Sequence, residues 1–230
     1  GAFTLVQTVT DADGDSDTAA LDLGTGVFVI EDDGPEIGTP TPAEAGDLTL
    51  DETDLTGASI STSANFGGNF GVPDYGTDGP GAVSYGFVLV SGIGSGLYAL
   101  DAADVTLADA DGIGQGDEIL LHVNADGTLI TGSTAAPGDP INAGNTYFTI
   151  AVDNDPLSLT FGQVTFTQTQ NIWHSNIGDH DEPESLVADG AFSLVQTVTD
   201  ADGDSDTAAL DLGAGVFVIE DDGPEIGTPT

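Results

Sequence analysis

Acidic residues at every second position form the most prominent chemical motif of this sequence. The run Asp-Ala-Asp-Gly-Asp-Ser-Asp occupies residues 11–17 and returns at residues 200–206. Alternating carboxylates converge on one point when the backbone curls, and Gly14 permits the tight turn that this requires. Oxygen ligands at this spacing predict a Ca²⁺ loop, the alternative being an acidic turn that holds no ion. The predicted ligands are Asp11, Asp13, Asp15, Asp17, Asp200, Asp202, Asp204 and Asp206.

The motif differs from the helical calcium loop that it partly resembles. It shares the alternating acids that open an EF-hand loop, but its glycine stands at the fourth position rather than the sixth. Its twelfth residue is Asp22 rather than glutamate. The flanking residues 5–9 and 18–21 have the composition of strands. We therefore expect the acids to lie in a turn between two strands.

Shorter acidic groups elsewhere are predicted as further Ca²⁺ ligands. Glu-Asp-Asp-Gly-Pro occurs at residues 31–35 and 220–224, and Leu-Asp-Glu-Thr-Asp occupies residues 50–54. We expect acids from the two sides of this joint between repeats to share Ca²⁺ and stiffen it, the alternative being an acidic, flexible linker. Residues 109–118 and 153–156 have the composition of two further acidic loops. The predicted ligands are Glu31, Asp32, Asp33, Asp51, Glu52, Asp109, Asp111, Asp117, Glu118, Asp153, Asp155, Glu220, Asp221 and Asp222.

The charge balance indicates that these acids need an external counter-ion. The sequence has 40 Asp and Glu residues, 31 of them Asp, and no Lys or Arg, so its formal charge is −40. A hydrophobic fraction of 39% is still large enough for a folded core. Several Ca²⁺ ions per repeat would supply the missing charge, the alternative being the solvated surface of a halophilic protein. The same charge excludes nucleic acid and anionic lipid as partners.

A long internal repeat defines the domain organisation. Residues 1–41 recur as residues 190–230 with only two differences, at an offset of 189 residues. This offset far exceeds a solenoid repeat, so each repeat is expected to be a whole domain in a tandem array. A run rich in Pro and Gly, residues 33–42, marks the junction. The expected divisions are 1–34 as the end of one repeat, 35–223 as a complete repeat and 224–230 as the next linker.

The hydrophobic pattern predicts strands throughout. Alternating apolar residues mark residues 1–10 and 83–89, and residues 118–124 and 128–131 bracket an Ala-Asp-Gly turn that predicts a hairpin. No stretch of ten residues has a convincing helical period. We predict an all-β fold of Ig-like or Greek-key β-sandwich domains, with one large or two smaller sandwiches per repeat. Further strands are predicted at residues 145–152, 157–161 and 163–169.

The residue types of this chain do not favour an enzyme. The chain has no Cys and a single Trp, so a Cys nucleophile is excluded and the aromatic wall of a glycosidase cleft is hard to build. The three histidines, His122, His174 and His180, lack the i, i+4 spacing of a zinc motif. No apolar run approaches the length of a membrane span. We predict that the chain is not an enzyme and is not inserted in a membrane.

Four short segments resemble the long repeats of giant type I-secreted RTX adhesins of Gram-negative bacteria. They are Leu-Asp-Glu-Thr at 50–53, Asn-Ile-Trp-His at 171–174, Val-Thr-Asp-Ala-Asp-Gly-Asp at 198–204 and Phe-Val-Ile-Glu-Asp-Asp-Gly-Pro at 217–224. The resemblance implies a secreted, extracellular region that extends from the outer membrane toward a separate adhesive tip. It also implies that Ca²⁺ at the Asp loops stiffens this stalk and drives folding after export.

These observations favour a structural role. The predicted function is a Ca²⁺-rigidified extender of a cell-surface or biofilm adhesin fibre, whose partners are neighbouring repeats of the same chain. Two alternatives stay open, a Ca²⁺-dependent glycan-binding module and a surface-layer or matrix repeat that associates laterally. Near-identical tandem copies favour the extender, because a ligand-binding tip is usually unique, although weak binders also gain from repetition.

Overall fold

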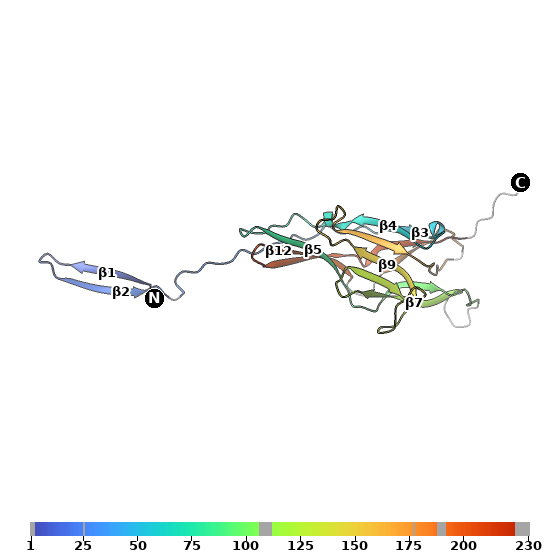
Figure 1. Ribbon diagram of the computed structural model, residues 1–230, viewed down its shortest axis with the longest axis horizontal. Helices are drawn as coiled ribbons and strands as arrows, with labels where there is room; N and C mark the ends of the chain where they lie inside the picture. Colours follow the sequence, from blue (N-terminus) through green and yellow to red (C-terminus); the bar gives the residue numbers. More distant parts are fainter. Residues whose placement is uncertain (1–2, 25, 106–111, 177, 188–191, 224–230) are drawn as a thin grey trace. The chain divides into compact units, whose positions relative to one another are not determined.

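The computed structural model describes residues 3–24, 26–105, 112–176, 178–187 and 192–223 (Figure 1). The chain divides into two compact units, Gly1–Asp33 and Gly34–Thr230. Regular structure in the described ranges consists of β-strands and two short 3-10 helices, η1 (Glu52–Asp54) and η2 (Phe66–Asn69). No helix in these ranges is long and apolar enough to cross a membrane.

A six-stranded antiparallel sheet forms one layer of the second unit. Strands β6 to β10 make a continuous meander, since each pairs with the next along the chain, and β4 adds to the free side of β10. The Ala-Asp-Gly turn joins β7 to β8, so the predicted hairpin is confirmed. In spatial order the strands are β4 (Ile60–Asn65), β10 (Gln163–Gln168), β9 (Thr146–Val152), β8 (Leu129–Ser133), β7 (Gln115–Val123) and β6 (Ile93–Leu100).

Two three-stranded sheets complete the second unit. In the first, β14 pairs antiparallel with β11 and parallel with β3. In the second, β12 pairs antiparallel with both β13 and β5. The strands are β11 (Pro183–Val187), β14 (Ala214–Glu220) and β3 (Leu48–Asp51), and then β13 (Ser205–Asp211), β12 (Ser193–Asp200) and β5 (Pro80–Val88).

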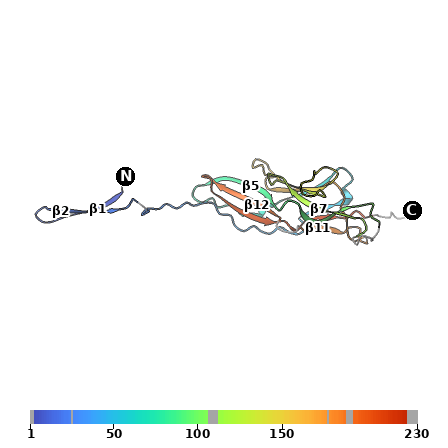
Figure 2. The same ribbon diagram turned by 90° about the horizontal axis from the view of Figure 1, so that it is seen from below.

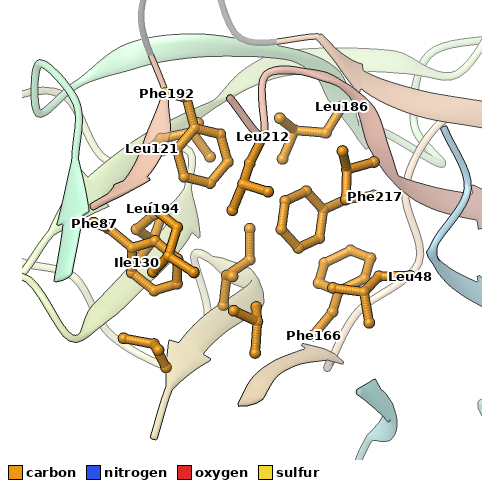
Figure 3. Close-up of a cluster of buried hydrophobic side chains, with 14 of the residues drawn as sticks. Leu48, Phe87, Leu121, Ile130, Phe166, Leu186, Phe192, Leu194, Leu212 and Phe217 are labelled. Atoms are coloured by element: carbon orange, nitrogen blue, oxygen red, sulfur yellow. The ribbon is translucent and has the colours of Figure 1, made fainter. Parts of the chain in front are cut away.

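One hydrophobic core joins the three sheets (Figure 3). The rings of Phe166 in β10 and Phe217 in β14 have centroids 5.3 Å apart, and Phe217 stacks on Phe192 at 5.8 Å. The ring of Phe192 lies 6.0 Å from that of Phe87 in β5. Buried side chains of every sheet belong to this single cluster. The all-β sandwich prediction is therefore confirmed, and the second unit is one large sandwich rather than two smaller ones.

Residues 157–161 were wrongly predicted as a strand. They form a turn in which Leu157 and Leu159 are fully exposed. The Asp155 carboxylate accepts the Leu157 N–H at 2.9 Å, and the Asp153 carboxylate accepts the Thr160 hydroxyl at 2.6 Å. These short-range hydrogen bonds give the backbone an alternative to strand pairing, so an apolar alternation of two leucines does not decide the local structure.

The first unit is a β-hairpin that repeats part of the second unit. Strand β1 (Thr4–Thr10) pairs with β2 (Ser16–Asp22) in the same register as β12 with β13. Residues 27–31 have the same sequence as the last five residues of β14 but are not in a strand. Their side chains and the apolar side chains of the hairpin are exposed, because residues 1–33 contain no counterpart of β3, β5 or β11.

The Pro- and Gly-rich run after Asp33 lies against the second unit. Glu36 and Asp74 exchange backbone hydrogen bonds at 2.8 and 3.1 Å. The Ile37 N–H donates to the Asp206 carboxylate at 2.9 Å, and the Ile37 side chain packs on the core. The start of this run is thus part of the folded sandwich rather than a free linker.

The chain enters and leaves the second unit at opposite ends (Figures 1 and 2). The hydrogen bond between Ile37 and Asp206 fixes the entry beside the β12–β13 turn. From that turn, β13 and β14 follow one another almost directly and run to the exit. Beyond β14, the Asp221 N–H donates to the Glu182 carbonyl at 3.1 Å, which fixes the exit. The unit therefore separates its entry and exit by most of its length.

Candidate metal centres

The β12–β13 turn curls its acids around the Asp200 side chain. The Asp200 carboxylate accepts the N–H groups of Gly203 at 2.9 Å and Asp204 at 2.8 Å. The Asp200 N–H donates to the Asp204 carbonyl at 3.0 Å. Gly203 has a φ of 113°, a left-handed conformation that favours glycine. The tight turn predicted from the sequence is therefore present, and its carboxylates lie on its inner side.

Asp200 is buried with one oxygen unused. Its residue is 3% exposed, and its Oδ2 has no hydrogen-bond partner among the described residues. Burial alone would raise the pKa of Asp200, but hydrogen bonds, above all from Gly203, outweigh it and hold this pKa below its usual range. One oxygen each from Asp200, Asp202 and Asp204 lie within 4.8 Å of one another. Oxygens on opposite sides of a Ca²⁺ ion are about 4.8 Å apart, so the group fits such an ion.

The copy of this turn in the first unit has the same geometry without the burial. The Asp11 carboxylate accepts the N–H groups of Gly14 at 3.1 Å and Asp15 at 3.0 Å, and Asp11, Asp13 and Asp15 form a three-oxygen group. Hydrogen bonding with the Asp13 side chain, the largest contribution, lowers the pKa of Asp11. Since Asp11 is exposed, water can hydrogen-bond to its carboxylate, so this copy has less need of an ion than the buried one.

The fourth acid of each turn lies outside these groups. The Asp17 carboxylate accepts the N–H of its neighbour Thr18 at 2.9 Å. The Asp206 carboxylate accepts N–H groups from Thr207 at 2.8 Å and from Ile37 at 2.9 Å. Asp206 therefore fixes the entering chain rather than completing the Asp200 group.

A second group of acids lies at the exit end. Asp51 ends β3 and Glu220 ends β14, and the parallel register places these two residues opposite one another. One oxygen each from Asp51, Asp181 and Glu220 lie within 4.8 Å of one another. Burial, followed by the charges of Asp181 and Asp51, raises the pKa of Glu220. Three acids that repel in this way would bind a cation favourably.

The exit group differs from the expected arrangement across a joint. We expected the acids that end a repeat to meet those that begin the next one. Asp51 and Glu220 instead belong to the same unit, because β14 returns to pair with β3. The parallel pairing brings the end of the repeat to its own beginning, so this group closes one sandwich on itself.

A third group, beside the ends of the same two strands, includes a histidine. Glu52 and Asp221 directly follow Asp51 and Glu220, the last residues of β3 and β14. Atoms of Glu52, Asp221 and His174 lie within 4.8 Å of one another. Glu52 is 3% exposed, and burial, the main cause, raises its pKa to about 7. The Ile172 N–H donates to the Glu52 Oε1 at 2.8 Å, and the Gln168 Nε2 donates to the same oxygen.

Neighbouring hydrogen bonds fix the loop that carries His174. The Glu182 side chain accepts the N–H of Ser175 at 3.0 Å and its hydroxyl at 2.8 Å. The Trp173 N–H of the backbone donates to the Tyr98 carbonyl at 2.8 Å, and its indole donates to the Ile113 carbonyl at 2.9 Å. His174 is thus held between two anchored neighbours.

Several predicted ligands belong to none of the groups described above. Asp117 and Glu118 lie within β7 rather than in a loop, and Glu118 accepts the Gly96 N–H at 3.3 Å. Asp153 and Asp155 close the turn described above, and hydrogen bonds from Ser158 and Thr160 lower the pKa of Asp153. Asp109 and Asp111 lie outside the described residues. Of the remainder, Glu31, Asp32 and Asp33 end the first unit outside any strand, and Asp222 is exposed beyond β14.

His174 and Asp181 were not predicted as ligands, although each belongs to one of these groups. Both lie in the loop before β11, far along the chain from the strand ends that they approach. Only the parallel pairing of β3 with β14 brings their partners together, and no local pattern reveals that pairing. The unusual combination of His, Asp and Glu in residues 174–184 was the one available signal.

Comparison with known proteins connects the chain to a family without an assigned function. A family model described as Domain of unknown function (DUF5801) matches residues 47–213, more than half of the chain. The matched range contains Glu52, His174 and the Asp200 turn, and it ends before β14. Searches of curated proteins and of solved structures found no match.

Proposed function

We propose that this chain, which belongs to the DUF5801 family, is a Ca²⁺-stiffened structural repeat from the extracellular stalk of a Gram-negative surface adhesin. In this proposal the repeat has no catalytic role, and its partners are neighbouring repeats of the same chain. Its task is to add length and stiffness between the cell surface and a distant adhesive tip.

The observation that carries the proposal is the buried carboxylate of Asp200. Its Oδ2 has no hydrogen-bond partner among the described residues, and one of its two oxygens lies within 4.8 Å of oxygens of Asp202 and Asp204. The chain has no Lys or Arg that could balance these charges. A buried carboxylate without a compensating charge is costly, and a Ca²⁺ ion supplies that charge with the oxygen ligands present. Backbone carbonyls and water can complete the six to eight ligands that Ca²⁺ takes.

The distribution of the acidic groups supports a stalk. One group lies at the entry end of the second unit and two lie at the exit end. Strands β13 and β14 and the two residues between them make up residues 205–220, a segment that would span about 50 Å if fully extended. A repeat whose ends are far apart adds most of its length to a fibre, whereas a repeat with adjacent ends would add little.

The proposed location supports the choice of ion. Extracellular Ca²⁺ is millimolar, which matches the affinity of about 10⁻⁴–10⁻³ M typical of extracellular modules. Because only the folded form assembles the groups, binding would stabilise it by mass action. With so little Ca²⁺ in the cytosol, the highly charged chain would fold only after export.

Thermal unfolding followed by circular dichroism tests this function. At a few millimolar Ca²⁺, each occupied site should add about 1–2 kcal/mol of stability over the same protein in EDTA. Two occupied sites should raise Tm by roughly 4–16 °C for a unit of this size. Mg²⁺ should have a much smaller effect, because it keeps its water and demands a stricter geometry. Identical melting curves in EDTA and Ca²⁺ would contradict the proposal, and a rise that NaCl reproduces would favour a halophilic surface instead.

Substitution of Asp200 locates one of these sites. Asp200→Asn keeps the oxygen that accepts the Gly203 and Asp204 N–H groups but removes the charge. The Ca²⁺-dependent rise in Tm should fall by roughly 2–8 °C, which corresponds to one lost site. Asp11→Asn is the matched control, since it makes the same change in the exposed copy of the turn. If both variants keep the full response to Ca²⁺, the Asp200 group is not a stabilising site.

A further inference from the structure

His174 is a buried histidine whose ring nitrogens lack partners. Its side chain is 6% exposed, and neither Nδ1 nor Nε2 has a hydrogen-bond partner among the described residues. The nearest charged group is the Glu52 Oε2, 3.9 Å from the Nε2, which is too far for a hydrogen bond. A buried polar group without a hydrogen-bond partner destabilises the fold, so a partner that binds both the ring and the acids would be favourable here.

The surroundings of His174 contain two carboxylates, and the chain has no Lys or Arg to balance them. The Glu52 Oε1 already accepts the Ile172 N–H and the Gln168 amide, which leaves the Oε2 facing His174. The Gln168 Oε1 is itself buried without a partner among the described residues. Asp221 adds a second carboxylate, and the chain has no Lys or Arg to balance either one. A metal cation would satisfy the carboxylates and the imidazole together.

The ligand types distinguish this group from the oxygen-only groups. Ca²⁺ takes oxygen ligands, whereas a neutral imidazole together with carboxylates is a typical ligand set for Zn²⁺ and related transition ions. We propose that Glu52, His174 and Asp221 form a transition-metal site of the Zn²⁺ class, separate from the Ca²⁺ sites. Each ligand comes from a different segment: η1, the loop before β11, and the residue after β14.

Such an ion would cross-link the sandwich at its exit. Tetrahedral ligands at Zn²⁺ distances lie about 3.4 Å apart, so the 3.9 Å separation of His174 and Glu52 needs only a small closure. Because the three ligands lie far apart in the sequence, the bound ion would tie the end of the repeat to its beginning. This inference does not depend on the proposed stalk function, since the site lies within one unit.

Zinc titration in the presence of excess Ca²⁺ tests the site. The full chain is held at 5 mM Ca²⁺ (about five times the weakest expected Kd), so that oxygen-only groups are filled, and Zn²⁺ binding is followed by calorimetry. We expect one strong site per chain. His174→Gln should weaken it by at least about 100-fold, the upper range for losing a supporting residue of a metal site. His180→Gln is the matched control, because His180 is exposed in the same loop and belongs to no such group.

Nuclear magnetic resonance of the wild-type protein gives a second readout that needs no variant. The chain has only three histidines, so ring ¹⁵N signals in a histidine-labelled sample can be assigned singly. One equivalent of Zn²⁺ should shift a ring nitrogen of His174 and leave His122 and His180 unchanged. The proposal fails if His174 does not respond, if His174→Gln binds Zn²⁺ as tightly as wild type, or if 5 mM Ca²⁺ abolishes the binding. Failure of Ca²⁺ to stabilise the fold would leave these results unaffected.

Discussion

Phe217→Ala should lower the free energy of unfolding of the second unit by about 3–5 kcal/mol, the range for removing a buried phenylalanine ring. Phe217 is 0% exposed and contacts the rings of both Phe166 and Phe192 (Figure 3). It therefore joins the six-stranded sheet to the strands of the other layer. Truncation leaves a cavity where the two layers meet, and close-packed neighbours can fill it only in part.

The chain contains its own control for this prediction. Phe28 has the same neighbours in sequence as Phe217, but it is 70% exposed in the first unit. Phe28→Ala should change the stability of the second unit by no more than about 0.5 kcal/mol. Urea unfolding at saturating Ca²⁺ can be followed by the fluorescence of Trp173, the single tryptophan, which lies in the second unit. Equal effects of the two substitutions would mean that β14 does not pack as described.

The same pair of copies separates what the sequence determines locally from what it does not. The same hairpin, with the same turn hydrogen bonds, forms at residues 4–22 and 193–211. Among the described residues, only the second copy pairs with a further strand, β5. The turn needs only its acids, its glycine and the flanking strand residues, so short-range pattern was sufficient to predict it. The alternation of apolar residues in β5 and the turn between β7 and β8 were predictable for the same reason.

Strand β14 is the opposite case. Its sequence forms a strand in the second unit but not at residues 27–31, so pairing with β3 and β11 decides its structure. Both exit groups depend on this parallel pairing, which joins residues near the two ends of the repeat. The sequence identified Asp51, Glu52, Glu220 and Asp221 as candidate ligands, but not which of them meet. Local composition does not encode a contact between residues so far apart in the chain. For the same reason, it could not predict that the loop carrying His174 and Asp181 approaches these strand ends.

Glu52→Gln should raise the stability of the metal-free protein at pH 8 by about 3 kcal/mol and leave it nearly unchanged below pH 4.5. Burial raises the pKa of Glu52 from 4.5 to about 7, so the folded protein holds this proton more tightly than the unfolded chain. Protonated Glu52 thus contributes stability that is complete below pH 4.5 and is lost as the pH rises to about 7. Each pKa unit corresponds to about 1.4 kcal/mol, which gives the expected size. Glutamine keeps the oxygen that accepts from Ile172 and carries no charge to bury.

The measurement is urea unfolding in EDTA at several pH values between 4.5 and 8, with Glu44→Gln as the matched control. Glu44 is exposed, so its replacement removes one charge from the −40 total without removing a buried one. The difference between the two variants should grow as the pH rises from 4.5 to about 7 and then level off, because it reports the burial of the Glu52 charge alone. If Glu52→Gln behaves like Glu44→Gln at every pH, water must reach Glu52 in the metal-free protein. In that case η1 would become accessible to water when no ion is bound, and metal binding would be what orders the exit end of the sandwich.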